Sequence, residues 1–98
     1  MLLRYAIGAT LRRIRLDRSL TLRVVADEAR ISMPYLSEIE RGRKEASSEI
    51  LAVICAALGM TVLDLLREVT EEAVVIDLAG RRAELAPSAT RGVALSAA

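Results

Sequence analysis

The stretch ISMPYLSEIERGRKEASSE, residues 31–49, constrains this fold more than any other part of the chain. Ser32 can accept a hydrogen bond from a backbone N–H one turn later, which favours a helix start there. Pro34 falls in the first turn, where its missing N–H breaks no hydrogen bond. Gly42 can adopt the left-handed conformation that ends a helix. The stretch therefore predicts a short helix with both ends fixed by local residues.

This predicted helix has two different faces. Leu36 and Ile39 are three residues apart, so both should point toward a core. The opposite face carries Met33, Pro34, Ser37 and Glu38. Basic residues gather just beyond the helix: Arg41, Arg43 and Lys44. The pattern is typical of a helix that is open on one side and cationic at its C-terminal end.

A second helical pattern comes directly before it, from Thr21 to Arg30. Thr21 is the expected N-cap. Apolar or small residues recur at helical spacing, at Leu22, Val25, Ala26 and Ala29. Two short helices joined by a few residues, with a small residue such as Ala26 where they cross, describe a helix-turn-helix.

The two helices together resemble the Cro/repressor-type (XRE) helix-turn-helix family. The run YLSEIERGRKEASSE is similar more narrowly to actinobacterial regulators of Clp protease genes, which are transcriptional activators. The resemblance spans roughly residues 8–66. It implies an all-α, five-helix, repressor-like DNA-binding domain, acting as a homodimer on a pseudo-palindromic operator. The implied function is sequence-specific transcriptional regulation, with activation of Clp protease and proteostasis genes.

Two other functions stay open at this point. One is an antitoxin or phage-type repressor with a protein or small-ligand partner. The other is a protein-interaction module that has kept the fold and lost DNA binding.

Three positions depart from the family pattern. Leu22 stands where the family usually has a phosphate-binding Gln, so that contact is lost. Arg30 occupies the turn position that usually carries Gly, and at positive φ it would cost about 1 kcal/mol. Ala46 replaces the usual Pro after the basic cluster. The last two departures affect loop geometry and leave the fold unchanged.

The resemblance also implies which residues bind DNA. Bases would be read at Met33, Pro34, Ser37 and Glu38. The first two can make only apolar contacts, best with thymine methyl groups, whereas Glu38 can accept from cytosine N4 or pair with Arg41 or its neighbours. Because none of the four is Arg, Asn or Gln, DNA shape should contribute more to recognition. Phosphate contacts are expected from Arg23, Tyr35, Arg41, Arg43 and Lys44.

Several charged residues have a predicted role outside base reading. Glu40 matches a family position that stabilises the motif through nearby arginines. Asp27 matches a position that touches RNA polymerase in related activators, although a solvated carboxylate is the alternative. The arginines of the first helix are expected to be solvated, with a phosphate contact from one or two of them as the alternative; solvation is favoured at Arg4, and both stay open at Arg12, Arg13, Arg15 and Arg18.

Three more helices are predicted around the motif. Residues 2–17 carry an apolar stripe at Leu3, Ile7, Leu11 and Ile14. A fourth helix begins after Ser47 or Ser48 and ends at Gly59, with an apolar face at Ile50, Leu51, Ile54, Cys55 and Leu58. A fifth begins after Thr61, which Asp64 can cap reciprocally.

The C-terminal part divides by composition. We expect a DNA-binding domain over residues 1–72, a dimerisation extension over 73–85 and a flexible tail over 86–98. The apolar run at 73–80 could be helix or strand. Dimerisation or core packing is expected at Val69, Val74, Val75, Ile76 and Leu78. The final Ala97-Ala98 resembles tags that Clp-type proteases recognise, with an incidental terminus as the alternative.

Composition limits the remaining functions. The net charge is only +1, yet residues 1–48 hold ten basic and six acidic side chains, and residues 49–98 four and seven. Such asymmetry is typical of nucleic-acid binding at one end. With no His and a single Cys55, expected to be buried and inert, we predict no metal, no cofactor and no enzyme activity. No apolar run predicts a membrane helix or a signal peptide, so a cytoplasmic protein is expected.

Overall fold

The computed structural model describes residues 2–71, which form five helices. They are α1 (Leu3–Asp17), α2 (Leu22–Ala29), α3 (Met33–Glu40), α4 (Ser48–Leu58) and a further helix, Val62–Glu71. No strand occurs within residues 2–71, and the predicted all-α, five-helix fold is confirmed. The predictions for residues 72–98, including the dimerisation extension, the helix-or-strand choice and the tail, lie outside the described residues.

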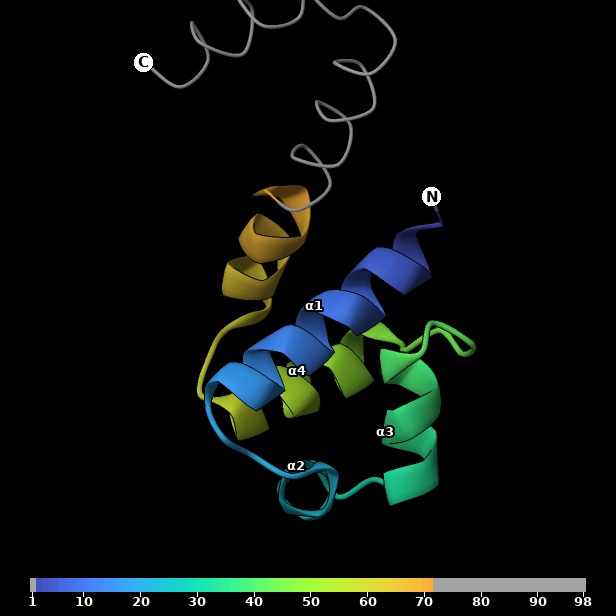
Figure 1. Cartoon of the computed structure of the whole chain (residues 1–98), viewed down its shortest axis with the longest axis vertical. Helices are drawn as coiled ribbons and strands as arrows, with labels where there is room; N and C mark the ends of the chain where they lie inside the picture. Colours follow the sequence, from blue (N-terminus) through green and yellow to red (C-terminus); the bar gives the residue numbers. More distant parts are fainter. Residues whose placement is uncertain (1, 72–98) are drawn as a thin grey trace, which may run out of the picture.

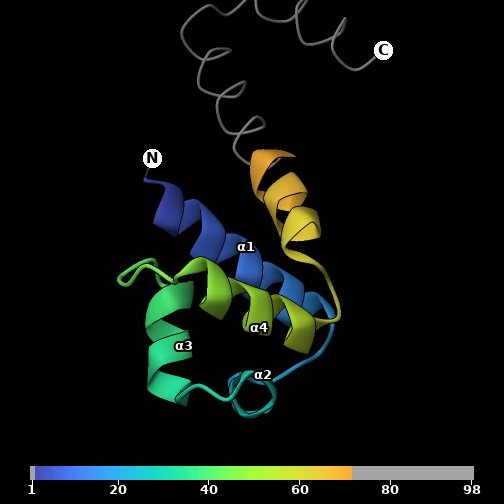
Figure 2. The same cartoon turned by 180° about the vertical axis from the view of Figure 1, so that it is seen from behind.

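The helix-turn-helix stands at one end of the molecule (Figure 1). α2 packs against α3 and α4, and α1 packs against α3. The Val62–Glu71 helix lies at the opposite end from α2 in both views (Figures 1 and 2). α3 runs along one edge, and no other described helix covers its outer side (Figures 1 and 2).

Local capping explains where the helices after α1 begin; Leu2, before α1, makes no side-chain cap. The side chains of Thr21, Ser32 and Ser47 each accept a hydrogen bond from the backbone N–H three residues on, at 3.1–3.2 Å. Thr61 and Asp64 exchange two hydrogen bonds of 3.0 Å, which is the predicted capping box. Each cap satisfies a donor that the helix itself leaves free. The predicted N-caps are therefore confirmed, with Ser47 chosen over Ser48.

The core is aliphatic, as the shortage of aromatic residues predicts. Every helix contributes to it, and its largest fully buried apolar side chains are Leu11, Val25, Leu36, Ile39, Ile54 and Leu65. The predicted apolar stripe of α1 is wrong at one position. Leu3 is 66% exposed, because it lies in the first turn of α1, at the rim of an open pocket.

Two apolar residues of the Val62–Glu71 helix differ in burial. Val69 was predicted as part of a dimer interface or of the core, and it is 4% exposed in the core of the single chain. Leu66 of the same helix is 47% exposed. Because Val69 has almost no surface left to offer a second chain, it is removed from the expected interface.

A glycine allows α1 and α3 to approach closely. A Cβ at Gly8 would lie 2.3 Å from the carbonyl oxygen of Ile39 and 2.6 Å from that of Glu40. No side chain fits at such distances, so the backbone of α1 rests directly on the end of α3. This contact fixes the position of α3 relative to the rest of the fold.

No single described helix is long and apolar enough to cross a membrane. α4 and the Val62–Glu71 helix meet that criterion only as a pair, and they are bent by 91°.

Candidate nucleic-acid interface

The outer face of α3 is open to solvent in the way the spacing predicts. Leu36 and Ile39 are 0% and 2% exposed, so the inner face is fully packed. On the outer face Met33 is 39% exposed, Pro34 is exposed, and Ser37 and Glu38 are partly exposed. The structure therefore brings together all four residues that were predicted to read bases.

The loop after α3 is held in place by α1. Gly42 has φ of +74°, where it ends the helix as predicted. Its carbonyl oxygen accepts a hydrogen bond of 2.8 Å from Arg4 Nε. The ring of Tyr5 packs so closely on Gly42 that a Cβ there would lie 2.4 Å from ring atom Cδ1. The first turns of α1 thus anchor the loop that carries the basic residues.

The basic residues around α3 are mostly exposed. Arg41, Arg43 and Lys44 are exposed beyond its C-terminal end, and Arg23 is exposed on α2. Lys44 Nζ lies 5.9 Å from the centre of the Tyr35 ring, within cation–π range. Tyr35 itself is half-buried and packs against the core, so this residue combines a core contact with a position beside the cations.

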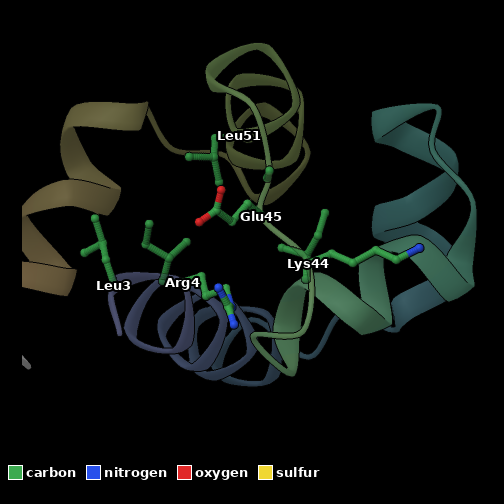
Figure 3. Close-up of a pocket in the computed structure, with 8 residues that line it drawn as sticks. Leu3, Arg4, Lys44, Glu45 and Leu51 are labelled. Atoms are coloured by element: carbon green, nitrogen blue, oxygen red, sulfur yellow. The ribbon is translucent and has the colours of Figure 1, made fainter. Parts of the chain in front are cut away.

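Lys44 and the next residue point in different directions. An open pocket of about 260 Å³ lies between α1, the loop and α4. Figure 3 shows Glu45 directed into this pocket and Lys44 extended away from it. The ammonium group therefore belongs to the α3 side of the loop and the Glu45 carboxylate to the α1 side.

The turn between α2 and α3 contains the strained arginine that the sequence predicts. Arg30 has φ of +58° and ψ of +42°, the left-handed conformation that glycine usually supplies. The N–H groups of Arg30 and Ile31 donate to the carbonyl oxygens of Asp27 and Ala26, at 3.2 and 3.0 Å. These two bonds hold the turn despite a strain of about 1 kcal/mol.

Glu40 forms the structural ion pair that was expected, and its partner is Arg15 of α1. Arg15 Nε lies 2.7 Å from Glu40 Oε2, and Nη2 lies 3.0 Å from Oε1. Nη1 also donates to the carbonyl oxygen of Leu20 at 2.9 Å. Hydrogen bonding to Glu40 raises the pKa of Arg15, so the guanidinium stays charged.

The two roles expected for Arg15, solvation and a phosphate contact, are therefore both wrong. The sequence contained one signal, because Arg15 lies four residues after the buried Leu11 and hence beside the apolar stripe.

Other arginines of α1 also bind within the chain. Arg13 pairs with Glu68 at 2.9 Å and with Asp17 at 3.4 Å, which joins α1 to the Val62–Glu71 helix. Arg18 donates to the carbonyl oxygen of Leu58 at the end of α4. Arg4 and Arg18 are thus structural, a role that the sequence did not predict. Arg12 and Asp27 are exposed.

Glu38 has a different environment from its three neighbours on the outer face. Its Oε2 atom has no solvent-exposed area and accepts no hydrogen bond from the described residues. Arg43 Nε is the cation beside it, at 3.9 Å.

The described residues offer no site for metal chemistry. They contain no group of three His, Cys, Asp or Glu side chains placed to hold an ion. Cys55 is 1% exposed, and burial raises the pKa of its thiol above the ordinary value, so the thiol stays protonated at neutral pH.

The surface around α3 can bind a polyanion through its exposed cations while it presents one face of a helix.

Residues 6–69 match the family model described as a helix-turn-helix domain. The chain belongs to this helix-turn-helix family. Over 57 residues this helix-turn-helix protein is 58% identical to the transcriptional regulator ClgR of Mycobacterium tuberculosis, an alignment that covers 58% of this chain and 51% of ClgR. The crystal structure of the clp gene regulator ClgR from Corynebacterium glutamicum matches with a TM-score of 0.73 and 48% identity, covering 89% of this chain and 97% of that one.

A phage protein is also similar. The immunity repressor protein of Bacillus phage phi105 is 36% identical over 64 residues, which cover 65% of this chain and 44% of the repressor. The chain thus spans about half the length of the curated relatives it matches.

Proposed function

We propose that this helix-turn-helix protein is a sequence-specific, DNA-binding transcription regulator that places α3 in the major groove of its operator. The observation that carries the proposal is the outer side of α3, which no described helix covers (Figure 1), together with exposed cations beyond its C-terminal end. An α-helix fits the major groove of B-DNA, and its first residues meet the base edges. Family membership and the ClgR similarity support the same function.

Direct base reading falls to Met33, Pro34 and Ser37. The first two residues stand at the start of α3 and have no hydrogen-bonding side chain, so they select thymine through its methyl group. Ser37 adds one hydroxyl that can donate or accept. With so few polar groups, α3 can form few hydrogen bonds to base edges, and DNA shape therefore supplies a larger share of the sequence specificity.

Phosphate binding falls to Arg23, Arg41, Arg43 and Lys44, with the Tyr35 hydroxyl at the groove edge. These residues come from α2, from α3 and from the loop after it, so they can flank a helix lying in the groove. Each neutralised phosphate releases counterions, which makes binding strongly dependent on salt.

The active species is proposed to be a homodimer on a pseudo-palindrome, with half-sites about 34 Å apart. Its support in the structure is apolar surface on the Val62–Glu71 helix, where Leu63 is 57% and Leu66 47% exposed. The apolar run at 74–78 continues this character in the sequence. Sedimentation should show a dimer at micromolar concentration, and Leu66→Glu should shift it toward monomer. A wild-type monomer that protects a single half-site would contradict the dimer.

Activation of Clp protease and proteostasis genes is proposed from the similarity to the clp gene regulator of Corynebacterium glutamicum. Exposed Asp27 on α2 is then the proposed contact for RNA polymerase. A phage-type repressor is the second candidate, supported by the phi105 repressor. A reporter gene behind the selected operator separates the two, because an activator raises its expression and a repressor lowers it. An activator should also lose its effect with Asp27→Ala while still binding DNA.

Selection of DNA from a random pool by the purified full chain tests the central proposal. Enrichment of one pseudo-palindromic sequence, confirmed by gel retardation, is the expected result. Failure to retard any DNA at low salt would refute DNA binding and favour a protein-interaction module.

A further inference from the structure

The end of α3 is shaped so that Glu38 and Arg43 face each other. The N–H of Gly42 donates to the carbonyl oxygen of Ile39, and the N–H of Arg43 donates to that of Glu38, both at 3.0 Å. This paired pattern, with Gly42 at φ of +74°, reverses the chain over the last turn of the helix. The turn brings Arg43 back beside the last turn of α3, where its Nε atom lies near Glu38 Oε2.

One oxygen of the Glu38 carboxylate is buried, and no described residue donates a hydrogen bond to it. Glu38 Oε2 has no solvent-exposed area and no hydrogen-bond donor among the described residues, which is unfavourable for a charged oxygen. Arg43 Nε lies 3.9 Å away, too far for a hydrogen bond. The Arg43 side chain is 64% exposed, and a shift of about 1 Å would bring its Nε to normal hydrogen-bond distance.

A guanidinium can bind two anions at once. Its Nε–H and one terminal N–H form one edge, and the two terminal nitrogens form another. A carboxylate on the first edge leaves the second directed outward, with the planar geometry that suits a phosphate. A lysine has one ammonium group and cannot hold both anions in fixed directions.

We propose that Glu38 is a positioning residue for Arg43 and does not itself read a base. Glu38 holds the Nε edge of the guanidinium, and the outward edge of Arg43 binds a DNA phosphate at the end of α3. The inference rests on the proposed DNA-binding function and assigns the role of one carboxylate within it. It also gives the buried Oε2 its donor in the bound state.

Whether neutralising Glu38 weakens or strengthens DNA binding tells positioning of Arg43 apart from simple electrostatic repulsion. A carboxylate near DNA repels phosphates, so neutralising it should by itself strengthen binding. If Glu38 positions Arg43, neutralising it should instead weaken binding, because the guanidinium is no longer held. Once Arg43 is absent, only the repulsion remains.

The experiment measures dissociation constants for the selected operator and for a set of operators with single base-pair changes. Glu38→Gln is made in three backgrounds: wild type, Arg43→Ala and Arg43→Lys. Each background is also measured without it, and the matched control is made in the wild-type and Arg43→Ala backgrounds. Glu45→Gln is the matched control, because it removes the same charge from the neighbouring loop while its side chain points into the pocket on the α1 side (Figure 3). Thermal unfolding verifies that each variant folds as the wild type does.

Glu38→Gln should weaken binding about three- to tenfold for every operator in the set. In the Arg43→Ala background the same change should leave affinity unchanged or strengthen it. Glu45→Gln should have the same small strengthening effect in both backgrounds. Arg43→Lys should reduce the effect of Glu38→Gln, since an ammonium group lacks the rigid planar edges that hold two anions in fixed directions.

Two results would overturn the inference while leaving DNA binding intact. A loss confined to one base pair and equal in both backgrounds would make Glu38 a base reader. Stronger binding by Glu38→Gln in the wild-type background would show that Glu38 only repels the DNA phosphates and does not position Arg43. If wild type binds no DNA, the proposed function fails, and this inference fails with it.

Discussion

Arg15 and Glu40 form a two-pronged ion pair between α1 and the last residue of α3, with nitrogen–oxygen distances of 2.7 and 3.0 Å. The two side chains are only 9% and 6% exposed. The pair therefore ties α3 to α1, which packs against it. Like the backbone contact at Gly8, it joins α1 to the end of α3.

The first prediction is that breaking this pair destabilises the fold severely. Arg15→Met leaves the buried Glu40 carboxylate without its cation, which should cost about 3–5 kcal/mol of unfolding free energy. Equilibrium unfolding in urea measures this loss of unfolding free energy. Arg13→Met is the matched control, because the Arg13–Glu68 pair is 40% and 43% exposed and should contribute less than about 1 kcal/mol. Equal losses in the two variants would contradict a special role for Arg15.

The second prediction concerns Gly8→Ala. Alanine should stabilise a helix interior by about 1 kcal/mol relative to glycine. Here its Cβ would lie 2.3 Å from the Ile39 carbonyl oxygen, so the clash should dominate and the net loss should be at least about 2 kcal/mol.

Gly59→Ala provides the comparison for this variant. Gly59 has φ of +77°, but the nearest heavy atom to its added Cβ is 3.6 Å away. Only the backbone strain of about 1–2 kcal/mol should therefore appear. A Gly8→Ala variant as stable as the wild type in thermal unfolding would show that α1 and α3 can separate at low cost.

The third prediction separates base reading from phosphate binding. Met33→Ala should change which base is preferred at one operator position, by about 1–3 kcal/mol. Lys44→Ala should weaken binding to all sequences alike and reduce the salt dependence by about one phosphate contact. Titrations of operator and mutated operators at several salt concentrations measure both effects. Arg67→Ala, on the Val62–Glu71 helix, should alter neither; an altered salt slope there would indicate a wider interface.

The fourth prediction is a dependence of stability on pH. Hydrogen bonds from the backbone N–H and side chain of Thr61 lower the pKa of Asp64 below its ordinary value of 3.8. A carboxyl group with a lowered folded-state pKa stabilises the fold above the unfolded value and loses that contribution as pH falls through the folded value. Asp64→Asn should therefore lower the unfolding midpoint at neutral pH, and the difference from wild type should shrink as the pH falls below 3.8 and vanish once the pH is below the lowered folded-state pKa.

Asp27→Asn, on the exposed surface of α2, is the control for charge alone. A midpoint difference for Asp64→Asn that persists unchanged in acid would indicate that the loss comes from packing and not from the ionised carboxylate.

Local chemistry allowed the sequence by itself to determine the helices and their ends. A cap such as Ser32 interacts with a backbone group three residues away, and Gly42 and Gly59 act through their own φ angles. The open face of α3 also followed, because helical spacing places Pro34 and Glu38 opposite the buried Leu36 and Ile39. These features involve residues close in the chain, so no knowledge of packing was needed to predict them.

The tertiary structure alone decided which charged and apolar side chains are buried. Arg15 and Arg43 are chemically identical, yet Arg15 is held by a carboxylate 25 residues away and Arg43 remains 64% exposed. Val69 and Leu66 are both apolar and lie on one helix, and only the packing of that helix buries Val69 and leaves Leu66 exposed. Partners distant in sequence meet only when helices dock, and the free energy of burying a charge depends on the group it then meets.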